Sequence, residues 1–186
     1  MVIPFSKTQR GTQRGDEFAE LALPLFDSLY NFACWLAHDR SEAEDLVQEA
    51  YAKALKGFSS FQTGTNFRAW IFRILRNTFL NSRTGLAASQ TIALEDEEAL
   101  ESVPAAVTRE TPETLLFERA NQETIQGATE KLALPFREVL LLADVEEMPY
   151  REIAEALGIP AGTVMSRLAR ARRVLRGELQ DKVVRA

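Results

Sequence analysis

The stretch YREIAEALGIPAGTVMSRLARARRVLR, residues 150–176, decides the fold of the second half of the chain. A helix-turn-helix needs a small residue on its first helix, a turn residue that tolerates positive φ, and an apolar anchor on its second helix. Ala154, Gly158 and Val164 meet these needs at spacings of four and six residues. The sequence therefore predicts helices over about 150–157 and 161–178, joined by a turn at Gly158.

The second of these helices has an apolar side and a polar side. Its apolar side is a single stripe of residues at helical spacing. The stripe consists of Val164, Leu168, Ala171 and Leu175. The polar side has hydroxyl and guanidinium groups without a carboxylate, which suits a DNA major groove because Arg reads guanine edges. We expect DNA contacts from Thr163, Ser166, Arg167, Arg170 and Arg173, with Arg172 and Arg176 extending the positive surface.

Helical patterning also dominates the first part of the chain, where no convincing alternating strand is found. Pro24 predicts a break within a helix over about 16–37. Ser41 begins a capping box with the letters SEAE, and a helix over about 42–56 follows it. Gly57 stands where a left-handed C-terminal cap is expected.

The middle of the chain contains one more helix and then a linker. Asn66 can cap a helix over about 67–83, with Gly85 just past its end. Residues 85–111 lack strong periodicity and are interpreted as a linker. Further helices are predicted over about 113–131, with Thr111 as N-cap and Pro112 in the first turn, and over about 135–145.

The charge of the chain is segregated by segment. The net charge of −5 argues against a nucleic-acid partner. However, residues 68–83 contain four arginines and no acid, and residues 162–176 contain five arginines and no acid. Between these basic blocks, residues 94–101 contain five acids and no base, and residues 1–15 are interpreted as a flexible basic tail. The overall charge is therefore a poor guide to the partner.

The predicted helix over 67–83 combines an apolar stripe with a basic face. Phe67, Trp70 and Ile71 are best explained as core residues. The loop before this helix has aromatic and polar side chains. Such groups beside a basic helix can hold single-stranded bases by stacking and by hydrogen bonds to base edges. The loop and the basic face therefore form a candidate nucleic-acid site.

At these motifs the sequence resembles the extracytoplasmic-function (ECF) sigma factors. The segments similar to their region 2 are AEDLVQEAYAKAL, FSSF and NFRAWIFRILRNTFLNSR. The segment similar to their region 4 is LPFREVLLLADVEEMPYREIAEALGIPAGTVMSRLARARRVLR. With flanking helices the resemblance covers about residues 17–84 and 112–178, in the family's order and spacing.

The resemblance implies an all-α fold of two small helical domains, a region 2 bundle and a region 4 helix-turn-helix, on a flexible acidic linker. It implies that the chain directs core polymerase to promoters. Region 4 recognises the minus-thirty-five element, and region 2 recognises and melts the minus-ten element. The expected segments are a tail over 1–15, region 2 over 16–84, the linker over 85–111, region 4 over 112–180 and a tail over 181–186.

The resemblance also implies roles for single residues. Asp45, Gln48 and Glu49 match the family's contact with the polymerase β′ clamp helices, and their spacing places them on one helical face. The minus-ten and strand-opening set is Phe61, Gln62, Thr63, Asn66, Arg68, Arg73, Arg76, Asn77 and Asn81. The minus-thirty-five set lies on the predicted helix over 161–178 and consists of Thr163, Ser166, Arg167, Arg170 and Arg173. Implied partners are core RNA polymerase, through its β′ clamp helices and β flap, promoter DNA and an anti-sigma factor.

Three other classes of protein fit the sequence less well. A helix-turn-helix regulator acting without polymerase would explain residues 150–176 but not the region 2 segments. An enzyme is disfavoured by one His, one Cys and no Gly-rich phosphate loop. A polymerase-binding decoy that lacks DNA contacts is disfavoured by the arginine blocks. Cys34 is expected in the core, and no metal, cofactor or membrane insertion is expected, so the chain is interpreted as cytoplasmic.

Overall fold

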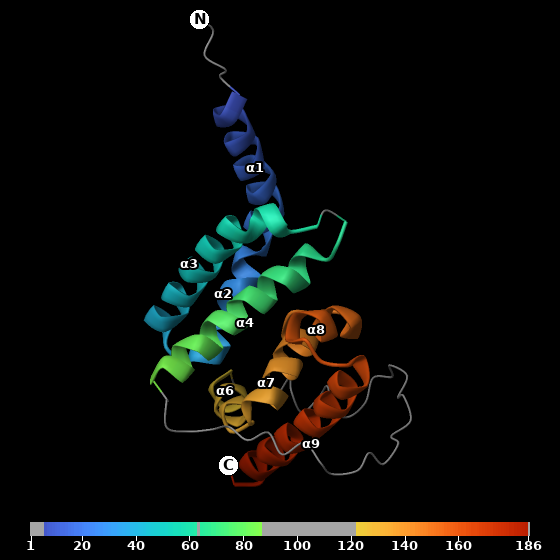
Figure 1. Ribbon diagram of the computed structural model, residues 1–186. Helices are drawn as coiled ribbons and strands as arrows, with labels where there is room; N and C mark the ends of the chain where they lie inside the picture. Colours follow the sequence, from blue (N-terminus) through green and yellow to red (C-terminus); the bar gives the residue numbers. More distant parts are fainter. Residues whose placement is uncertain (1–5, 63, 87–121, 186) are drawn as a thin grey trace, which may run out of the picture. The chain divides into compact units, whose positions relative to one another are not determined.

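The computed structural model describes residues 6–62, 64–86 and 122–185, and every regular element in these ranges is a helix (Figure 1). This confirms the all-α fold class. The chain divides into two compact units, of which the first contains α1 to α4 together with Arg151–Ile159. The second contains the helices between residues 122 and 145 and the last helix. Most of the expected linker and the helix start at Thr111 lie outside the described residues.

The first helix, α1 (Ser6–Ala22), begins well before the expected start at residue 16. The flexible tail predicted over 1–15 is therefore corrected to a helix from Ser6 onwards. Lys, Arg and Gln, which fill much of this segment, have high helix propensity, and no proline interrupts it. The break at Pro24 is confirmed, because a 3-10 turn, η1 (Leu23–Leu25), separates α1 from α2 (Phe26–Ala37).

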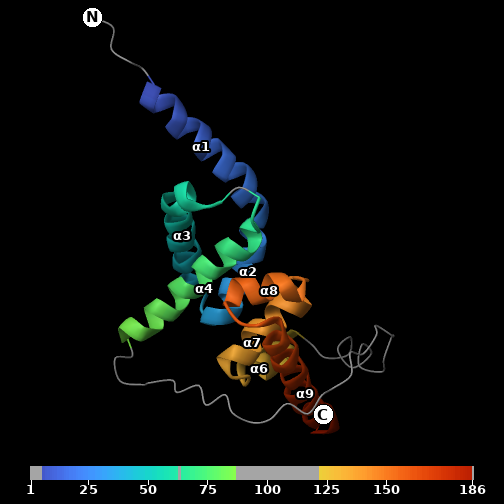
Figure 2. The same cartoon turned by 45° about the vertical axis from the view of Figure 1, so that its right-hand side comes forward.

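A bundle of α2, α3 (Arg40–Gly57) and α4 (Phe67–Leu86) forms the core of the first unit, and all three pairs of helices are in contact (Figures 1 and 2). Its centre contains Phe32 and Phe72, whose ring centroids lie 5.5 Å apart. The side of α3 that faces the bundle is lined with small residues, which allow its neighbours to approach closely. The fully buried residues of this core include Leu29, Ala33, Leu36, Ala43, Ala50, Ala54, Ile71 and Leu75.

The ends of α3 differ from the expected caps. Its N-cap is Asp39 rather than Ser41, because the Asp39 Oδ1 accepts a hydrogen bond of 2.8 Å from the Glu42 backbone N–H. Gly57 was expected to adopt a left-handed conformation, yet its φ is −83° and the chain continues directly into a 3-10 turn, η2 (Phe58–Ser60). The ring of Trp70 lies over Gly57, with 3.7 Å from its Cζ2 to an ideal Cβ position.

Only the first end of α4 is where the sequence predicted it. The Asn66 Oδ1 accepts a hydrogen bond of 3.0 Å from the Ala69 backbone N–H, which confirms Asn66 as the N-cap. Gly85 was expected beyond the helix end, but α4 runs through it to Leu86. A single glycine inside a helix costs only about 1 kcal/mol, and it need not end the helix.

The second unit is built on α6 (Gln122–Glu130), α7 (Leu134–Leu140) and α9 (Ala161–Arg185). A π-helical segment, η3 (Leu141–Val145), follows α7 directly. The helix α9 packs against both α6 and α7, and it buries the stripe predicted from the sequence, with Val164, Leu168, Ala171 and Leu175 each at most 3% exposed. It also continues to Arg185, so that the tail predicted over 181–186 is helical over most of its length.

The helix α8 (Tyr150–Leu157) ends in the predicted turn. Gly158 has a φ of +69°, which confirms the expected left-handed conformation. The backbone N–H groups of Gly158 and Ile159 both donate to the Ala154 carbonyl, at 2.9 and 3.1 Å. The chain then enters α9 after Pro160.

The turn gives a prediction for stability. Replacing Gly158 with Ala should lower the free energy of unfolding by about 1–2 kcal/mol, because a Cβ is disfavoured at positive φ even where no neighbouring atom would touch it. The same replacement at Gly177, an exposed position inside α9, should raise stability by about 0.5–1 kcal/mol. Urea unfolding followed by circular dichroism measures both. Equal effects of the two variants on stability would contradict the left-handed conformation of Gly158.

Candidate nucleic-acid interface

An acidic face lies on α3. Asp45, Gln48 and Glu49 are all exposed, which agrees with their expected position on one helical face. The Glu49 carboxylate forms an ion pair of 2.7 Å with the Lys53 Nζ. The same Nζ donates a hydrogen bond of 3.2 Å to the hydroxyl of Thr78, a buried residue of α4. Lys53 therefore restrains the Glu49 carboxylate and links the acidic face to α4.

The loop before α4 rests on a cluster of aromatic rings. Phe61 is half-buried and stacks nearly parallel on Phe58, with 5.9 Å between centroids. It also contacts Phe67 and Trp70, at 5.3 and 5.1 Å between centroids. On the opposite side of the cluster, Phe18 of α1 packs edge-on against Phe58 at 5.4 Å. The ring of Phe61 is therefore committed to packing with these three rings.

The same loop also carries polar residues. Gln62 is exposed, and its carbonyl accepts a hydrogen bond of 2.8 Å from the Thr65 hydroxyl. Gly64 has a φ of +93°, which turns the chain back toward α4. Asn66 is half-buried and uses its side chain as the helix cap. Thr63 lies outside the described residues.

Of the three α4 residues expected in the core, two are buried, whereas Trp70 is not fully buried. Phe67 and Ile71 are buried, at 8% and 0% exposure, which confirms them as core residues. Trp70 is only half-buried, beside Phe61. Part of the indole therefore reaches the surface next to the loop.

The polar residues expected on α4 fall into two sets. Arg73, Asn77 and Asn81 are exposed at four-residue spacing, so they form one stripe along the helix. Arg68 and Arg76 are half-buried, and the Arg68 guanidinium lies 5.8 Å from the centroid of the Phe72 ring. The stripe, which we call the α4 stripe, carries one guanidinium and two amides, and the Arg73 Nη2 donates a hydrogen bond to the Glu155 carbonyl.

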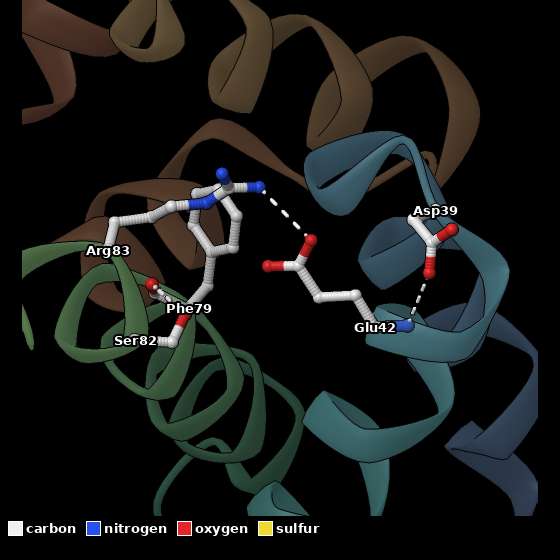
Figure 3. Close-up of polar contacts among 5 residues, drawn as sticks. All are labelled: Asp39, Glu42, Phe79, Ser82 and Arg83. Carbon is white, nitrogen blue, oxygen red and sulfur yellow. Dashed lines mark hydrogen bonds and ion pairs between the residues drawn. The ribbon is translucent and has the colours of Figure 1, made fainter. Parts of the chain in front are cut away.

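Arg83, the last arginine of this basic block, is engaged by an acid from α3. Its Nη2 lies 3.2 Å from the Glu42 Oε2, and its guanidinium lies 5.2 Å from the centroid of the Phe79 ring. Figure 3 shows the three side chains together. Glu42 is also the residue whose backbone N–H is held by the Asp39 cap (Figure 3). The block over 68–83 therefore offers less unbalanced positive charge than its sequence indicates.

On α9 the expected DNA-reading residues lie opposite the buried stripe or beside it. Ser166, Arg170 and Arg173 are exposed, while Thr163 and Arg167 are half-buried. The Ser166 hydroxyl donates to the Thr163 carbonyl at 3.1 Å, within the helix. The structure therefore brings this set together on one helix.

Two side chains from the segment before α8 restrain arginines of α9. The Arg170 guanidinium lies 5.3 Å from the centroid of the Phe136 ring. Asp144, in η3, accepts two hydrogen bonds from Arg172, one of 3.1 Å from Nε and one of 2.5 Å from Nη2. These hydrogen bonds to Asp144 raise the pKa of Arg172 above its ordinary value, although burial opposes them. Arg172 was expected to extend the positive surface, and its charge is instead balanced by Asp144.

The remaining expectations concern metals and membranes. Cys34 was expected in the core, but it is only half-buried on α2, and His38 ends that helix with a φ of +59°. Within the part of the chain that the structure describes, no group of three His, Cys, Asp or Glu residues is arranged to hold a metal ion. In the same residues, no helix is long and apolar enough to cross a membrane.

Comparison with known proteins identifies matches to both parts of the chain. The family model described as sigma-70 region 2 matches residues 25–87, and that described as sigma-70, region 4 matches residues 122–175. The RNA polymerase sigma-H factor of Pseudomonas aeruginosa is 30% identical over 177 residues, which cover 94% of this chain and 91% of that protein. The ECF RNA polymerase sigma factor EcfG of Rhodopseudomonas palustris is 33% identical over 157 residues, with 84% and 82% covered.

A solved structure is similar as well. It contains the sigma factor RpoE of Bartonella quintana in complex with the anti-sigma factor NepR. The match has a TM-score of 0.66 and 29% identity, and it covers 88% of this chain and 97% of the matched chain.

The pair of Arg172 and Asp144 gives a prediction for the second unit. A double-mutant cycle with Arg172→Gln and Asp144→Asn should yield a coupling free energy of roughly 1 kcal/mol, because the pair is bidentate but about 40% exposed. The matched control is Arg151 with Glu155, a single contact of 3.7 Å whose arginine side chain is 91% exposed. It should show no measurable coupling. Coupling of the same size in both cycles would contradict the role given to Asp144.

Proposed function

This chain belongs to the ECF RNA polymerase sigma factors, and on that premise we propose which of its surfaces meet the polymerase and the promoter. As a sigma factor of this type it directs core RNA polymerase to promoters. We assign the polymerase contact to the acidic face of α3. We assign the minus-ten contact to the loop with the α4 stripe, and the minus-thirty-five contact to the outward face of α9.

The observation that carries these assignments is the separation of charge on the exposed helix faces. On α3 the proposed contact offers two carboxylates and an amide, Asp45, Glu49 and Gln48. The α4 stripe and residues 162–176 of α9 contain no carboxylate. Acidic residues repel DNA phosphates, whereas guanidinium and amide groups can bind both phosphates and base edges. The α3 face therefore fits a basic protein surface, and the other two fit DNA.

Within the minus-ten site, the residues take different parts. We propose that Gln62, Thr63 and the exposed part of Trp70 receive a base flipped out of the non-template strand. Because Phe61 and Asn66 are committed to packing and capping, we assign them the support of the loop. Arg73, Asn77 and Asn81 would then grip the adjacent strand, with Arg68 and Arg76 adding positive charge at the edge.

The further partners follow from the family. We propose that core polymerase is bound through its β′ clamp helices by region 2 and through its β flap by region 4. An anti-sigma factor is proposed as the inhibitor, since the similar Bartonella quintana sigma factor was solved with one. The proposal assigns no catalytic step to this chain, because the polymerase makes the RNA, and it places the chain in the cytoplasm, where the polymerase works.

The polymerase contact is tested by reversing charge on α3. The variant with Asp45→Lys and Glu49→Lys should bind core polymerase at least about tenfold more weakly, because like charges placed face to face cost several kcal/mol. The control carries Glu17→Lys and Glu20→Lys, two exposed acids of α1 with the same change in charge. It should bind normally. Equal affinity of the two variants for core polymerase, measured by fluorescence titration, would refute the α3 assignment.

The promoter contact of α9 is tested by comparing neighbouring arginines. Arg173→Gln should weaken holoenzyme binding to promoter DNA by about tenfold, since a single arginine contact contributes about 1–3 kcal/mol. Arg172→Gln should change promoter affinity by less than about twofold, because Asp144 already engages that guanidinium. Binding is measured by gel shift at fixed salt. A larger loss for Arg172→Gln than for Arg173→Gln would overturn the assignment.

A further inference from the structure

An apolar side chain reaches the surface at one edge of the exposed side of α9. Met165 is 47% exposed, which places it among the few large hydrophobic residues that reach the surface. It lies in the second turn of the helix, between the buried Val164 and the exposed Ser166. Ala169, one turn further on, is exposed as well. Residues four apart share a side of a helix, so Met165 and Ala169 form a short apolar strip.

A single exposed apolar residue is common on proteins and by itself needs no explanation. The position of Met165 in the second helix of the helix-turn-helix is what points to a function. It is flanked along the chain by Thr163, Ser166 and Arg167, all assigned to minus-thirty-five recognition. In a helix-turn-helix, residues near the N-terminus of the second helix contact the base edges. A side chain at this position therefore meets bases rather than phosphates.

The chemistry of the major groove limits what such a side chain can recognise. Base edges there present hydrogen-bond donors and acceptors, and the 5-methyl group of thymine is their apolar group. A thioether side chain donates no hydrogen bond and accepts one only weakly. Its favourable contact in the groove is therefore with thymine methyl.

We propose that Met165, together with Ala169, packs against the 5-methyl group of a thymine in the minus-thirty-five element and so selects an A·T pair there. This inference rests on the proposed minus-thirty-five role of α9, and it adds the base that this part of the helix prefers. The serine and arginines read polar edges beside it. Met165 is thus a specificity-determining residue whose contribution is separable from theirs.

The test removes the methyl group alone. Holoenzyme first selects its promoter from a random duplex library, and each thymine of the minus-thirty-five element, on either strand, is then replaced in turn by deoxyuridine. At one or two positions the wild-type holoenzyme should bind the deoxyuridine duplex about fourfold more weakly than the thymine duplex. This is the effect expected when one methyl group is no longer buried. Met165→Gln, which keeps the length of the side chain, should bind the thymine and deoxyuridine duplexes equally. Met165→Leu should retain the difference.

A matched control lies on the same helix. Val174 is 40% exposed, yet it follows Met165 by nine residues, so it lies on the side of α9 toward Arg167 and Arg170 and away from Met165. Val174→Thr should discriminate the two duplexes as the wild type does. The proposal is overturned if deoxyuridine weakens wild-type binding at no position, or if Met165→Gln discriminates the thymine and deoxyuridine duplexes as well as the wild type does. It is also overturned if the selected element contains no A·T pair.

The same assays separate this inference from the function on which it rests. If Arg167→Ala and Arg170→Ala leave promoter selection unchanged, α9 does not read the element, and the proposed function fails. If those variants lose selection while deoxyuridine has no effect, only the role of Met165 fails.

Discussion

Burial of one stripe of α9 is the constraint on which the proposed DNA-binding surface depends. Val164, Leu168, Ala171 and Leu175 are held against α6 and α7. Because a helix is rigid and its side chains repeat every 3.6 residues, fixing this side also fixes what the other side presents. Ser166 and Arg173 point outward for that reason alone. The α4 stripe follows the same rule, since Ile71 and Leu75 are fully buried in the bundle with α2 and α3.

Local patterns in the sequence predicted these helices and several of their ends. The buried stripe of α9, the break at Pro24, the Asn66 cap and the left-handed Gly158 each depend on residues close together in the chain, and all are confirmed. The caps of α3 were missed for a physical reason. Asp39 and Ser41 are both good N-caps of similar strength, so the choice between them depends on the path of the chain. Gly57 could cap a helix, but the chain continues into η2 without needing a left-handed residue.

The electrostatics of the candidate site could not be predicted in the same way. Arg83 meets Glu42 across 41 positions of sequence, and Arg172 meets Asp144 across 28. No local pattern reveals such pairs, because they arise only when separate helices pack. They matter because each removes an arginine from the positive surface that the sequence indicated. The net charge of −5 thus coexists with small surfaces proposed to bind DNA, whose positive charge depends on a few exposed arginines, such as Arg170 and Arg173.

The most direct measurement of the central claim is run-off transcription from a library of promoters with purified core polymerase, combined with DNA binding by the chain alone. We predict specific transcripts only when the chain and core polymerase are both present, and no tight, sequence-specific binding by the chain without polymerase. The account would be contradicted if core polymerase gave no specific transcript with the chain while the free chain bound paired half-sites as a dimer.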